Sequence, residues 1–567
     1  MYKQILDPVG DSLGLSSIFA ALPLVALFVL LGVLRLKAWI AALLSLAVAL
    51  VVAIAVYSMP VGQALLAGSE GAAFGFFPIM WIVLNAIWLY NMTVVTGHFD
   101  VLRRSFAKVS DDQRVQAVII AFCFGALLEA LAGFGTPVAI TSVMLIALGF
   151  RPIKAAAVAL VANTAPVAFG AIAVPITTLA TVTGLPQDDL GAMVGRQTPV
   201  LAVFVPLALV FIVDRKNGLR QTWLAAVVCG GSFAVAQFVT SNYMSIELTD
   251  IVASLVGMGA TVLLLRVWSP SVRYLETDEP ELAGVTSGRG AAGTRSAGSG
   301  SAAATGADGA DVAVDDADVV DSRADVARAY SPYLILIAVL LVSQIPAVKD
   351  ALDSVTKLFN WPGLHIKSAN GEDSTIAAFK FNWLGATGTL VLFSGLLTIP
   401  AIGISLAKAA KAYADSYRQL ATAVLTVMAV LALAYVMNAS GQTATLGNWM
   451  AGAGAAFAVL SPILGWLGVA VTGSDTSSNS LFGALQVTAA HKAGLDPVLM
   501  AAANSSGGVL GKMISPQNLA IAAAAVGMAG QEGDLFRKVI GWSLVFIVGM
   551  SVLVYLQSTA VLGWMVP

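Results

Sequence analysis

Long apolar runs dominate the chain, and most of them are long enough to cross a lipid bilayer. The runs are continuous rather than alternating, which indicates helices and not the strands of a membrane barrel. A spanning helix needs about 20 apolar residues, so the pattern predicts an all-α polytopic membrane protein with about twelve transmembrane helices. These are expected near residues 16–34, 38–57, 76–95, 155–183, 198–213, 222–240, 249–267, 331–346, 381–406, 417–438, 496–528 and 539–562.

Two further apolar runs, 116–148 and 451–489, are interrupted in the middle by polar and glycine-rich sequence. The first interruption is Gly-Phe-Gly-Thr-Pro at 133–137, and the second is Thr-Gly-Ser-Asp-Thr-Ser-Ser-Asn at 472–479. Each run predicts two short helical arms around a turn, either as a re-entrant hairpin or as two thin spans. Both readings return the chain to the side that it left.

One stretch differs from the rest in composition. Residues 269–328 are mostly Ala, Gly, Ser and Asp, and between Arg273 and Arg328 there are 11 acidic residues and 5 arginines. Such a segment cannot bury enough apolar surface to offset its ordering entropy, so we expect a disordered acidic linker. It divides the chain into an N-terminal half, 1–268, and a C-terminal half, 329–567, and each half contains one hairpin.

The overall composition supports a membrane location. The chain is 58% hydrophobic and 11% charged, whereas soluble domains have about 25% charged residues. The net charge of −2 gives no sign of a nucleic-acid partner. Cys123 and Cys229 lie singly in apolar runs, so we expect neither a disulfide framework nor a thiolate metal site. His98, His365 and His491 are expected in loops and do not form a metal-ligand cluster.

Basic residues in short loops predict the orientation, because such residues accumulate on the cytoplasmic side. Twelve spans and two hairpins place six basic clusters on one side, with both termini outside and the linker in the cytoplasm. The loop at 347–380 has both lysines and acids, and we expect it to form a small extracellular cap of a plasma-membrane protein. The six clusters are Arg35 and Lys37; Arg103, Arg104, Lys108 and Arg114; Arg151 and Lys154; Arg215, Lys216 and Arg220; Lys408, Lys411 and Arg418; and Arg537 and Lys538.

The two halves contain an internal repeat. Segments 163–175 and 504–516 have Asn, Gly and Pro at identical positions, 341 residues apart, and segments 132–137 and 472–477 match at an offset of 340. In the predicted topology the first hairpin's ends lie inside and the second's outside, so the repeats are inverted. Inverted repeats with broken helices are typical of secondary transporters, whose substrates bind near the midplane. The alternative is that these glycines and prolines only kink packed helices.

Three charged residues are expected at membrane depth. A central charge costs on the order of 2.5–3.5 kcal/mol, so such residues usually have a partner or a task. Glu129 and Asp475 are the predicted proton carriers, because burial favours a protonated carboxyl group. Lys512 is the predicted partner of an anionic substrate, or the counter-ion of one of those acids. Alternatively, the two acids make only structural hydrogen bonds or lie at a hairpin tip that reaches water. The alternative for Lys512 is that its side chain extends to the membrane interface.

Neutral polar groups around the hairpin turns and helix breaks complete the predicted binding site. Hydroxyls and amides suit a small hydroxylated carboxylate, but they can equally ligate sodium, so the residue types leave the coupling ion open. The predicted set is Gly133, Gly135, Thr136, Asn163, Ser474, Thr476, Ser477, Asn504, Ser505, Ser506 and Gln517, and Thr164, Asn479, Ser515 and Asn518 lie among them.

The chain lacks the motifs of several membrane enzymes and pumps. It has no HExxH and no P-loop, which argues against a protease and an ATP-driven pump. A GxSxG occurs at residues 10–14, but it directly precedes an apolar run and follows no strand-like segment, which argues against an esterase. We therefore expect a protein that is not an enzyme and needs neither cofactor nor metal. A channel would not need the paired hairpins. The sequence leaves open whether the protein forms a homo-oligomer.

Four segments carry a resemblance to a known family: LLEALAGFGTPVAI at 127–140, RPIKAAAVALVANTAPVAFGAIAVP at 151–175, TGSDTSSNSLFGALQ at 472–486 and NSSGGVLGKMISPQNLAIA at 504–522. The chain resembles the lactate permease family, whose members are proton-driven symporters of L-lactate, D-lactate and glycolate. It departs from that family in its longer acidic linker and at Leu131-Ala132. The resemblance implies a small monocarboxylate and a proton as partners. The runner-up is a sodium-coupled carboxylate transporter.

Overall fold

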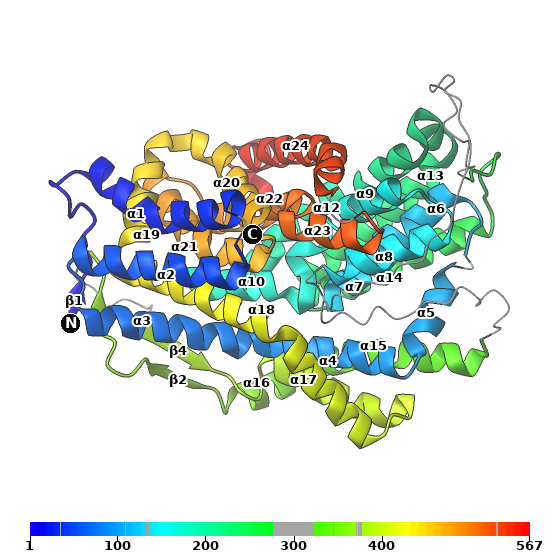
Figure 1. Cartoon of the computed structure of the whole chain (residues 1–567), viewed down its shortest axis with the longest axis horizontal. Coiled ribbons are helices and arrows are strands. Elements are labelled where there is room, and N and C mark those ends of the chain that lie inside the picture. The colour runs from blue at the N-terminus through cyan, green and yellow to red at the C-terminus, as the bar shows by residue number, and fades with distance from the viewer. Residues whose placement is uncertain are drawn as a thin grey trace, which may run out of the picture.

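The computed structural model describes residues 1–34, 36–107, 109–131, 133, 135–275, 321–343, 345–369, 371, 377–528 and 531–567. Most of the predicted linker, 276–320, lies outside the described residues, as do Ala132 and Phe134 in the turn of the first hairpin. The described chain is mostly helical (Figure 1).

The helices before the linker, with η marking short 3-10 or π segments, are α1 (Leu13–Phe28), η1 (Val29–Val33), α2 (Ala38–Ala55), α3 (Val61–Phe74), η2 (Gly75–Met80), α4 (Trp81–Val95), α5 (His98–Ala107), α6 (Gln113–Gln116), η3 (Ala117–Phe124), α7 (Gly125–Leu131), α8 (Thr136–Ala147), α9 (Pro152–Ala162), η4 (Val167–Phe169), α10 (Gly170–Thr183), α11 (Gln187–Val194), α12 (Thr198–Ala202), α13 (Val205–Tyr243) and α14 (Thr249–Leu265).

The helices after the linker are α15 (Arg323–Ser343), α16 (Pro346–Asp353), α17 (Thr387–Ile402), α18 (Leu406–Ser440), α19 (Gln442–Met450), η6 (Ala451–Ala456), α20 (Phe457–Thr472), α21 (Asp475–Ala493), α22 (Pro497–Gly511), η7 (Lys512–Ile514), α23 (Pro516–Ala525), α24 (Glu532–Gln557) and η8 (Gly563–Met565). The strands are β1 (Tyr2–Lys3), β2 (Lys357–Asn360), β3 (Ile366–Lys367) and β4 (Ala378–Phe381).

Fewer helices can span a membrane than the sequence pattern predicts. In the described part of the chain, 9 helical stretches are long and apolar enough, or up to 10 when α9 and the bent η4–α10 count as one. The predicted number of about twelve is therefore too high by this measure. Two predicted spans, α14 and α17, have only 17 and 16 residues, and the predicted span at 496–528 breaks into α22 and α23.

Two predicted loops are also different in the structure. The chain before residue 76 forms α3, which continues through η2 into α4 as one stretch, Val61–Val95. The predicted spans at 198–213 and 222–240 belong to one helical stretch, and non-helical backbone angles at Asp214 and Arg215 mark the expected loop between them. The charged side chains in these segments lowered their apparent hydropathy without preventing helix formation.

Four short strands depart from the all-α prediction. β1 pairs in parallel with β3, with Tyr2 opposite Ile366, and β2 pairs antiparallel with β4. Three of these strands come from the segment around the loop at 347–380, which therefore folds as a small cap together with α16. The Tyr2 hydroxyl donates to the backbone oxygens of Tyr57 and Ser440, each at 2.9 Å. These bonds fasten the N-terminus to the helical body.

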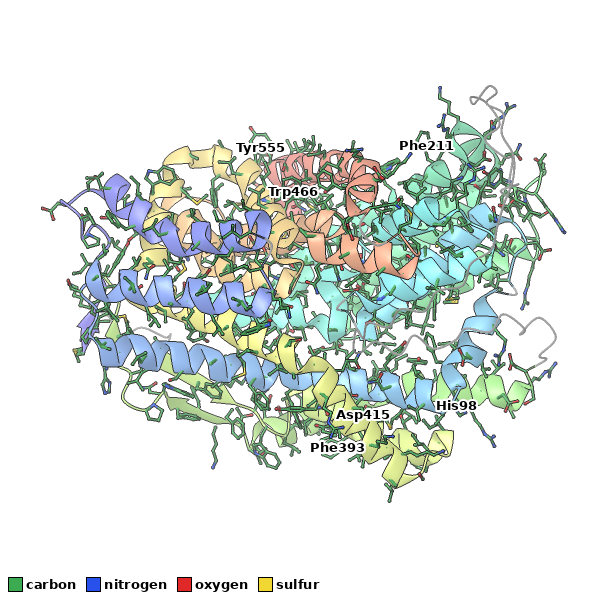
Figure 2. The ribbon with its side chains drawn as sticks, viewed as in Figure 1. His98, Phe211, Phe393, Asp415, Trp466 and Tyr555 are labelled. Carbon is green, nitrogen blue, oxygen red and sulfur yellow. The ribbon has the colours of Figure 1, made fainter. Side chains whose placement is uncertain are left out.

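The outer helices present many large apolar side chains. Figure 1 shows α1, α2 and α3 as a stack of nearly parallel helices, and α3 packs against the long α18. Val51, Leu397 and Val545 are each more than half exposed, and Figure 2 shows Phe393 and Tyr555 at the periphery of the molecule. Exposed apolar residues of this kind are expected where helices contact lipid.

Helices α20 and α22 pack unusually closely because glycines line their contact. A Cβ on Gly465 would lie 1.8 Å from the Asn504 backbone oxygen, and one on Gly507 would lie 2.1 Å from the Pro462 oxygen. Small residues allow such approach between membrane helices. The contact fixes α22, whose end carries Lys512, against the first arm of the second hairpin.

The cysteines and histidines differ in part from expectation. Cys123 and Cys229 are free and buried, but their Sγ atoms lie 3.2 Å apart because η3 packs against α13. His98 begins α5 and His491 lies in the last turn of α21, so neither is in a loop as predicted. In the described ranges no three metal-ligating side chains gather into one group.

Candidate functional site

The first predicted helix break is present. α9 and the following η4–α10 segment are bent by 66°. At the start of α10, Ala171, Ile172 and Ala173 have φ values of 45°, 58° and 57°, a left-handed conformation that costs an L-residue about 1–2 kcal/mol. All three are buried. Strain of this kind persists only when the surrounding packing enforces it, and it is frequent at functional sites.

The second break lies at the matching place in the C-terminal half. α22 ends at Gly511, Lys512 begins a single 3-10 turn, and α23 starts at Pro516. The Ser515 hydroxyl accepts from the Asn518 backbone N–H and caps α23, while Asn518 Nδ2 donates to the Lys512 backbone oxygen at 3.1 Å. The break therefore has its own polar partners, as irregular backbone at membrane depth requires.

Both hairpin turns lie against α23. Gly135, at φ 82°, ends the first turn, and a Cβ there would lie 2.4 Å from Ile521 Cδ1. Gly473, at φ 76°, ends α20, and a Cβ there would lie 2.6 Å from Gln517 Oε1. Ser474 then caps α21 by accepting from the Ser477 N–H. The two hairpins that the sequence pairs by similarity thus meet at one helix.

A buried ion pair joins the first hairpin to the second break. Lys512 Nζ lies 2.5 Å from Glu129 Oε1, and the two residues are only 6% and 3% exposed. Asn163, in the first break, donates from Nδ2 to Glu129 Oε2 at 3.0 Å. One carboxylate therefore holds together α7, the end of α9 and the 3-10 turn after α22.

Asp475 lies on the other side of this centre. Its Oδ2 accepts from Ser505 Oγ at 2.5 Å and from Asn479 Nδ2 at 3.3 Å. Its Oδ1 has no hydrogen-bond partner among the described residues. The Asp475 carboxylate is also close enough to Lys512 for their charges to attract each other. The lysine therefore faces an acid from each hairpin.

A row of amides connects the two repeats. Asn479 Nδ2 donates to the backbone oxygen of Pro175 at 3.1 Å, and Asn504 Nδ2 donates to Asn479 Oδ1 at 2.9 Å. Gln486 Nε2 donates in turn to Asn504 Oδ1 at 3.0 Å. The backbone carbonyl of Pro175, in the first broken helix, thus accepts a hydrogen bond from the second hairpin. Gln486 was not predicted, because an amide in the middle of a helix carries no sequence signal of its own.

The other predicted residues lie at different distances from the ion pair. A Cβ on Gly133 would be 3.7 Å from Glu129 Oε1, so this glycine borders the carboxylate. Ser506 is buried, and its hydroxyl lacks a partner in the described structure. Thr136 and Thr476 are partly exposed at the starts of their helices, and Gln517 is exposed. The structure brings the core of the predicted set together and leaves these three at its margin.

The sequence analysis missed three buried acids in the described structure, and one of them, Asp112, is paired with Arg114. Glu70 in α3 is fully buried and Asp250 in α14 is 1% exposed. Glu70 fell in a segment that was not expected to be helical. Asp250 occupies the first turn of a predicted span, a position where an acid is usually at the interface. Its burial depends on the neighbouring helices, which a single sequence does not reveal.

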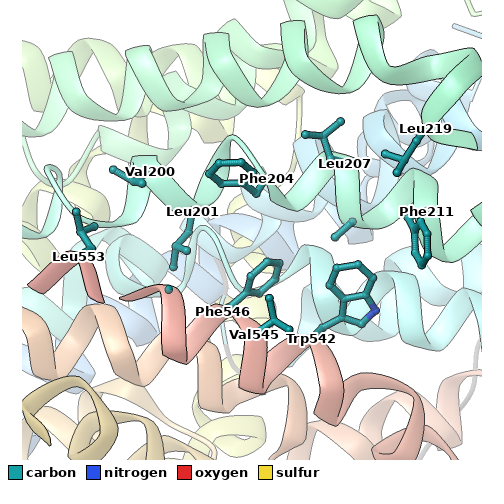
Figure 3. Close-up of a pocket in the computed structure, with 12 residues that line it drawn as sticks. Val200, Leu201, Phe204, Leu207, Phe211, Leu219, Trp542, Val545, Phe546 and Leu553 are labelled. Atoms are coloured by element: carbon teal, nitrogen blue, oxygen red, sulfur yellow. The ribbon is translucent and has the colours of Figure 1, made fainter. Parts of the chain in front are cut away.

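An apolar cavity lies apart from this charged centre. It has a volume of about 530 Å³ and lies between α12, α13 and α24 (Figure 3). Phe204, Phe211, Trp542 and Phe546 are among the apolar side chains that line it. It contains none of the predicted site residues and offers no group that would recognise a carboxylate.

The fold and the buried centre define a multi-pass helical membrane protein of the transporter type, in which two hairpins and two broken helices surround one lysine. The sequence model described as L-lactate permease matches residues 16–561. The chain belongs to the lactate permease family, as its motifs suggested, and it is a permease and not an enzyme.

Relatives in this family match along the whole chain. The L-lactate permease of Bacillus subtilis (strain 168) is 40% identical over 585 residues, covering 100% of both chains. The glycolate permease GlcA of Escherichia coli (strain K12) is 41% identical over 577 residues, covering 100% of this chain and 99% of that protein. Among solved structures, the YdaH transporter of Alcanivorax borkumensis matches with a TM-score of 0.43 and 14% identity, covering 87% of this chain and 88% of that one.

Proposed function

We propose that this protein is a secondary active symporter that imports lactate, and related 2-hydroxymonocarboxylates such as glycolate, together with protons across the plasma membrane. The names of its full-length relatives support the substrate class. The ion pair between Lys512 and Glu129 is the observation that carries the mechanism.

The proposed mechanism is a competition for one ammonium group. In the described structure, Glu129 neutralises Lys512. Protonation of Glu129 removes its charge and leaves Lys512 without a strong partner. The substrate carboxylate then takes that place, because a buried cation is stable only when it is paired. Anion binding and proton binding therefore depend on each other.

The hydroxyl of a 2-hydroxyacid needs groups that both donate and accept hydrogen bonds. Asn163 already donates to Glu129, Ser505 donates to Asp475, and the buried Ser506 hydroxyl is without a partner among the described residues. Asn504 extends this polar surface. These side chains are the proposed contacts of the substrate hydroxyl, alongside Lys512 for the carboxylate.

The matched hairpins and breaks support an inverted repeat between residues 1–268 and 329–567. Under the positive-inside rule, this arrangement has both termini outside and the linker 269–328 in the cytoplasm. It places the ion pair at the interface of the two repeats, where secondary transporters bind their substrates.

A sodium-coupled carboxylate transporter is the second proposal, and one observation favours it. The free Oδ1 of Asp475 and the unpartnered hydroxyl of Ser506 are buried oxygens of the kind that sodium prefers. The same Asp475 is a proton carrier in the leading proposal. The two proposals differ only in the coupling ion.

Purified protein in vesicles separates the two. An inward proton gradient without sodium should drive uptake of labelled lactate and glycolate, and a sodium gradient at equal pH should not. Lactate added to energised vesicles should also dissipate the pH difference. Uptake that requires sodium and leaves the pH difference intact would contradict proton coupling and support the alternative.

The amide variant Glu129→Gln tests the coupling role directly. It leaves Lys512 permanently accessible to substrate, so lactate exchange at equal pH should continue, whereas accumulation driven by a proton gradient should be lost. Asp475→Asn, measured in parallel, tells which acid carries the proton. Wild-type accumulation in both variants would show that the proton travels by another route.

A further inference from the structure

Asp250 is a buried carboxylate that the coupling mechanism above does not use. It lies in the first turn of α14, and its Oδ1 accepts from Gln237 Nε2 at 2.8 Å. Its Oδ2 has no hydrogen-bond partner within the described ranges. A buried carboxylate without a cation is costly in its ionised form. The surroundings therefore favour the protonated acid.

Asp250 is coupled to Glu129. α14 packs against α7, which carries Glu129, and the two carboxylates are close enough to repel each other when both are ionised. Gln237 Nε2 also reaches the backbone oxygen of Ala165 at 3.4 Å. Ala165 lies in the first helix break, two residues after Asn163, which donates to Glu129. The same break therefore positions both acids.

Lys512 pairs with Glu129 from the other side, and the helices that pack on α14 bring no further charge next to Asp250. The neighbouring η3 carries only uncharged residues, and α7 carries no ionisable residue besides Glu129. On α13, the neutral Gln237 faces Asp250, and the charged residues of that helix, Asp214 to Arg220, lie 17 or more residues before Gln237.

A polar cavity of about 490 Å³ lies next to Asp250 along the chain. Residues 241–247, from the end of α13 and the connection to α14, form one of its walls, and Asp188, Lys349 and Asp353 contribute others. Its lining includes Leu352 and Asp353 of α16, in the segment predicted to form the extracellular cap. With Glu247, the cavity contains three carboxylates and one ammonium. This excess of negative charge attracts protons and repels a lactate anion.

Glu247 gives the cavity a group that can hold a proton. Burial raises the pKa of this carboxyl group, the nearby Asp188 carboxylate raises it further, and the Ser245 hydroxyl and Lys349 lower it. The Ser245 hydroxyl donates to Glu247 Oε2 at 2.6 Å. Glu247 lines the cavity, and Asp250 follows three residues later in the chain, in the first turn of α14.

We propose that Asp250 relays the coupling proton from this polar cavity to Glu129. In the relay, the O–H bond of the Asp250 acid breaks as one forms on the Glu129 carboxylate, and the Asp250 anion is then reprotonated by a hydronium ion that enters through the cavity and becomes water. The total charge of the two acids does not change in the first step. This inference rests on the proposed proton-coupled function and gives the proton a path that the anionic substrate does not share.

The test uses Asp250→Asn in proteoliposomes. Asparagine keeps an oxygen for Gln237 but cannot carry the proton. Lactate counterflow at equal pH should stay close to wild type, while the initial rate of uptake driven by a pH gradient should fall roughly tenfold or more, as expected when a positioned proton-transfer group is removed. Asp250→Glu should restore much of that rate. Asp189→Asn, an exposed acid beside the cavity on α11, is the matched control and should change neither measurement.

Two results would overturn the relay. One is a wild-type rate and pH profile of gradient-driven uptake in Asp250→Asn. The other is an equal loss of counterflow and driven uptake that Asp250→Glu does not restore, which would assign Asp250 a structural role. Failure of the proposed function itself is recognised separately, because wild-type protein in the same vesicles would then need sodium or would show no uptake driven by protons.

Discussion

Lys512 shows what a single sequence can and cannot say about a side chain. Its position inside an interrupted apolar run predicted a functional charge, but left open whether its partner was the substrate or an acid. The structure pairs it with Glu129, 383 residues away in the chain. Such a contact depends on how two hairpins and two breaks assemble, and hydropathy contains no information about that assembly. The sequence therefore identified the polar residues individually, but it did not predict which of them pair.

We predict that Lys512→Gln weakens lactate binding by about 10- to 100-fold, because a hydrogen bond to a charged group contributes about 1.5–3 kcal/mol. Lys512→Arg should recover little, since a planar guanidinium does not replace a compact ammonium. The measurement is the KM of counterflow in vesicles, where no gradient is needed.

Lys538 on α24 is exposed. The variant Lys538→Gln is therefore the matched control and should keep the wild-type KM. The double variant Glu129→Gln/Lys512→Gln controls for misfolding of the single variant. It removes both charges of the buried pair at once, so neither charge is left buried without a partner. Wild-type affinity in folded Lys512→Gln would exclude this lysine as the carboxylate partner.

At the level of helices, the paired interruptions were predictable and their detailed form was not. Glycine, proline and polar residues in an apolar run predict a break, and both breaks occur where the repeat places them. The sequence did not predict the left-handed backbone at Ala171–Ala173, because alanine and isoleucine rarely adopt positive φ. The helix α3 was not predicted because its sequence has only a weak amphipathic pattern. It packs on α18, and this contact stabilises the helix.

The contact between α20 and α22 leads to a prediction about stability. Gly465→Ala would place a methyl group against the Asn504 backbone oxygen, and a backbone atom cannot rotate away. We expect a loss of about 1–3 kcal/mol, as for overpacked cores, measured as a lower Tm of the purified protein. Gly541→Ala, on α24 with open space around it, is the control and should not lower the Tm. An unchanged Tm for Gly465→Ala would mean that the two helices are free to separate.

At the scale of the whole molecule, composition identified the membrane class at once, but counting spans by length did not reproduce the helices. Short helices such as α14 and α17 belong to the apolar body although each is shorter than a standard span. The interrupted segments fold as pairs of helices separated by a break. A hydropathy window averages over such a break and counts the segment as one continuous span. The side of the membrane on which each loop lies still rests on the basic-residue rule.

That orientation can be tested with single cysteines. Lys357→Cys on the exposed strand β2 should react with a membrane-impermeant thiol reagent in intact cells. Lys408→Cys, exposed at the start of α18, should react only after permeabilisation. The two native cysteines are buried, so background labelling should be low. The reverse pattern would invert the topology and place the polar cavity beside Asp250 on the cytoplasmic side.

The buried pair of Glu129 and Lys512 also determines how the carrier responds to voltage. When the site is empty, the carboxylate and the ammonium cancel. When a proton sits on Glu129 and a lactate anion on Lys512, the charges cancel again. Moving one net charge across a membrane involves about 2.3 kcal/mol per 100 mV, and neither complete form carries one, whereas each half-loaded form does. The proposed cycle is therefore electrically silent, and a cell with a large membrane potential but no pH difference would not accumulate lactate above its outside concentration.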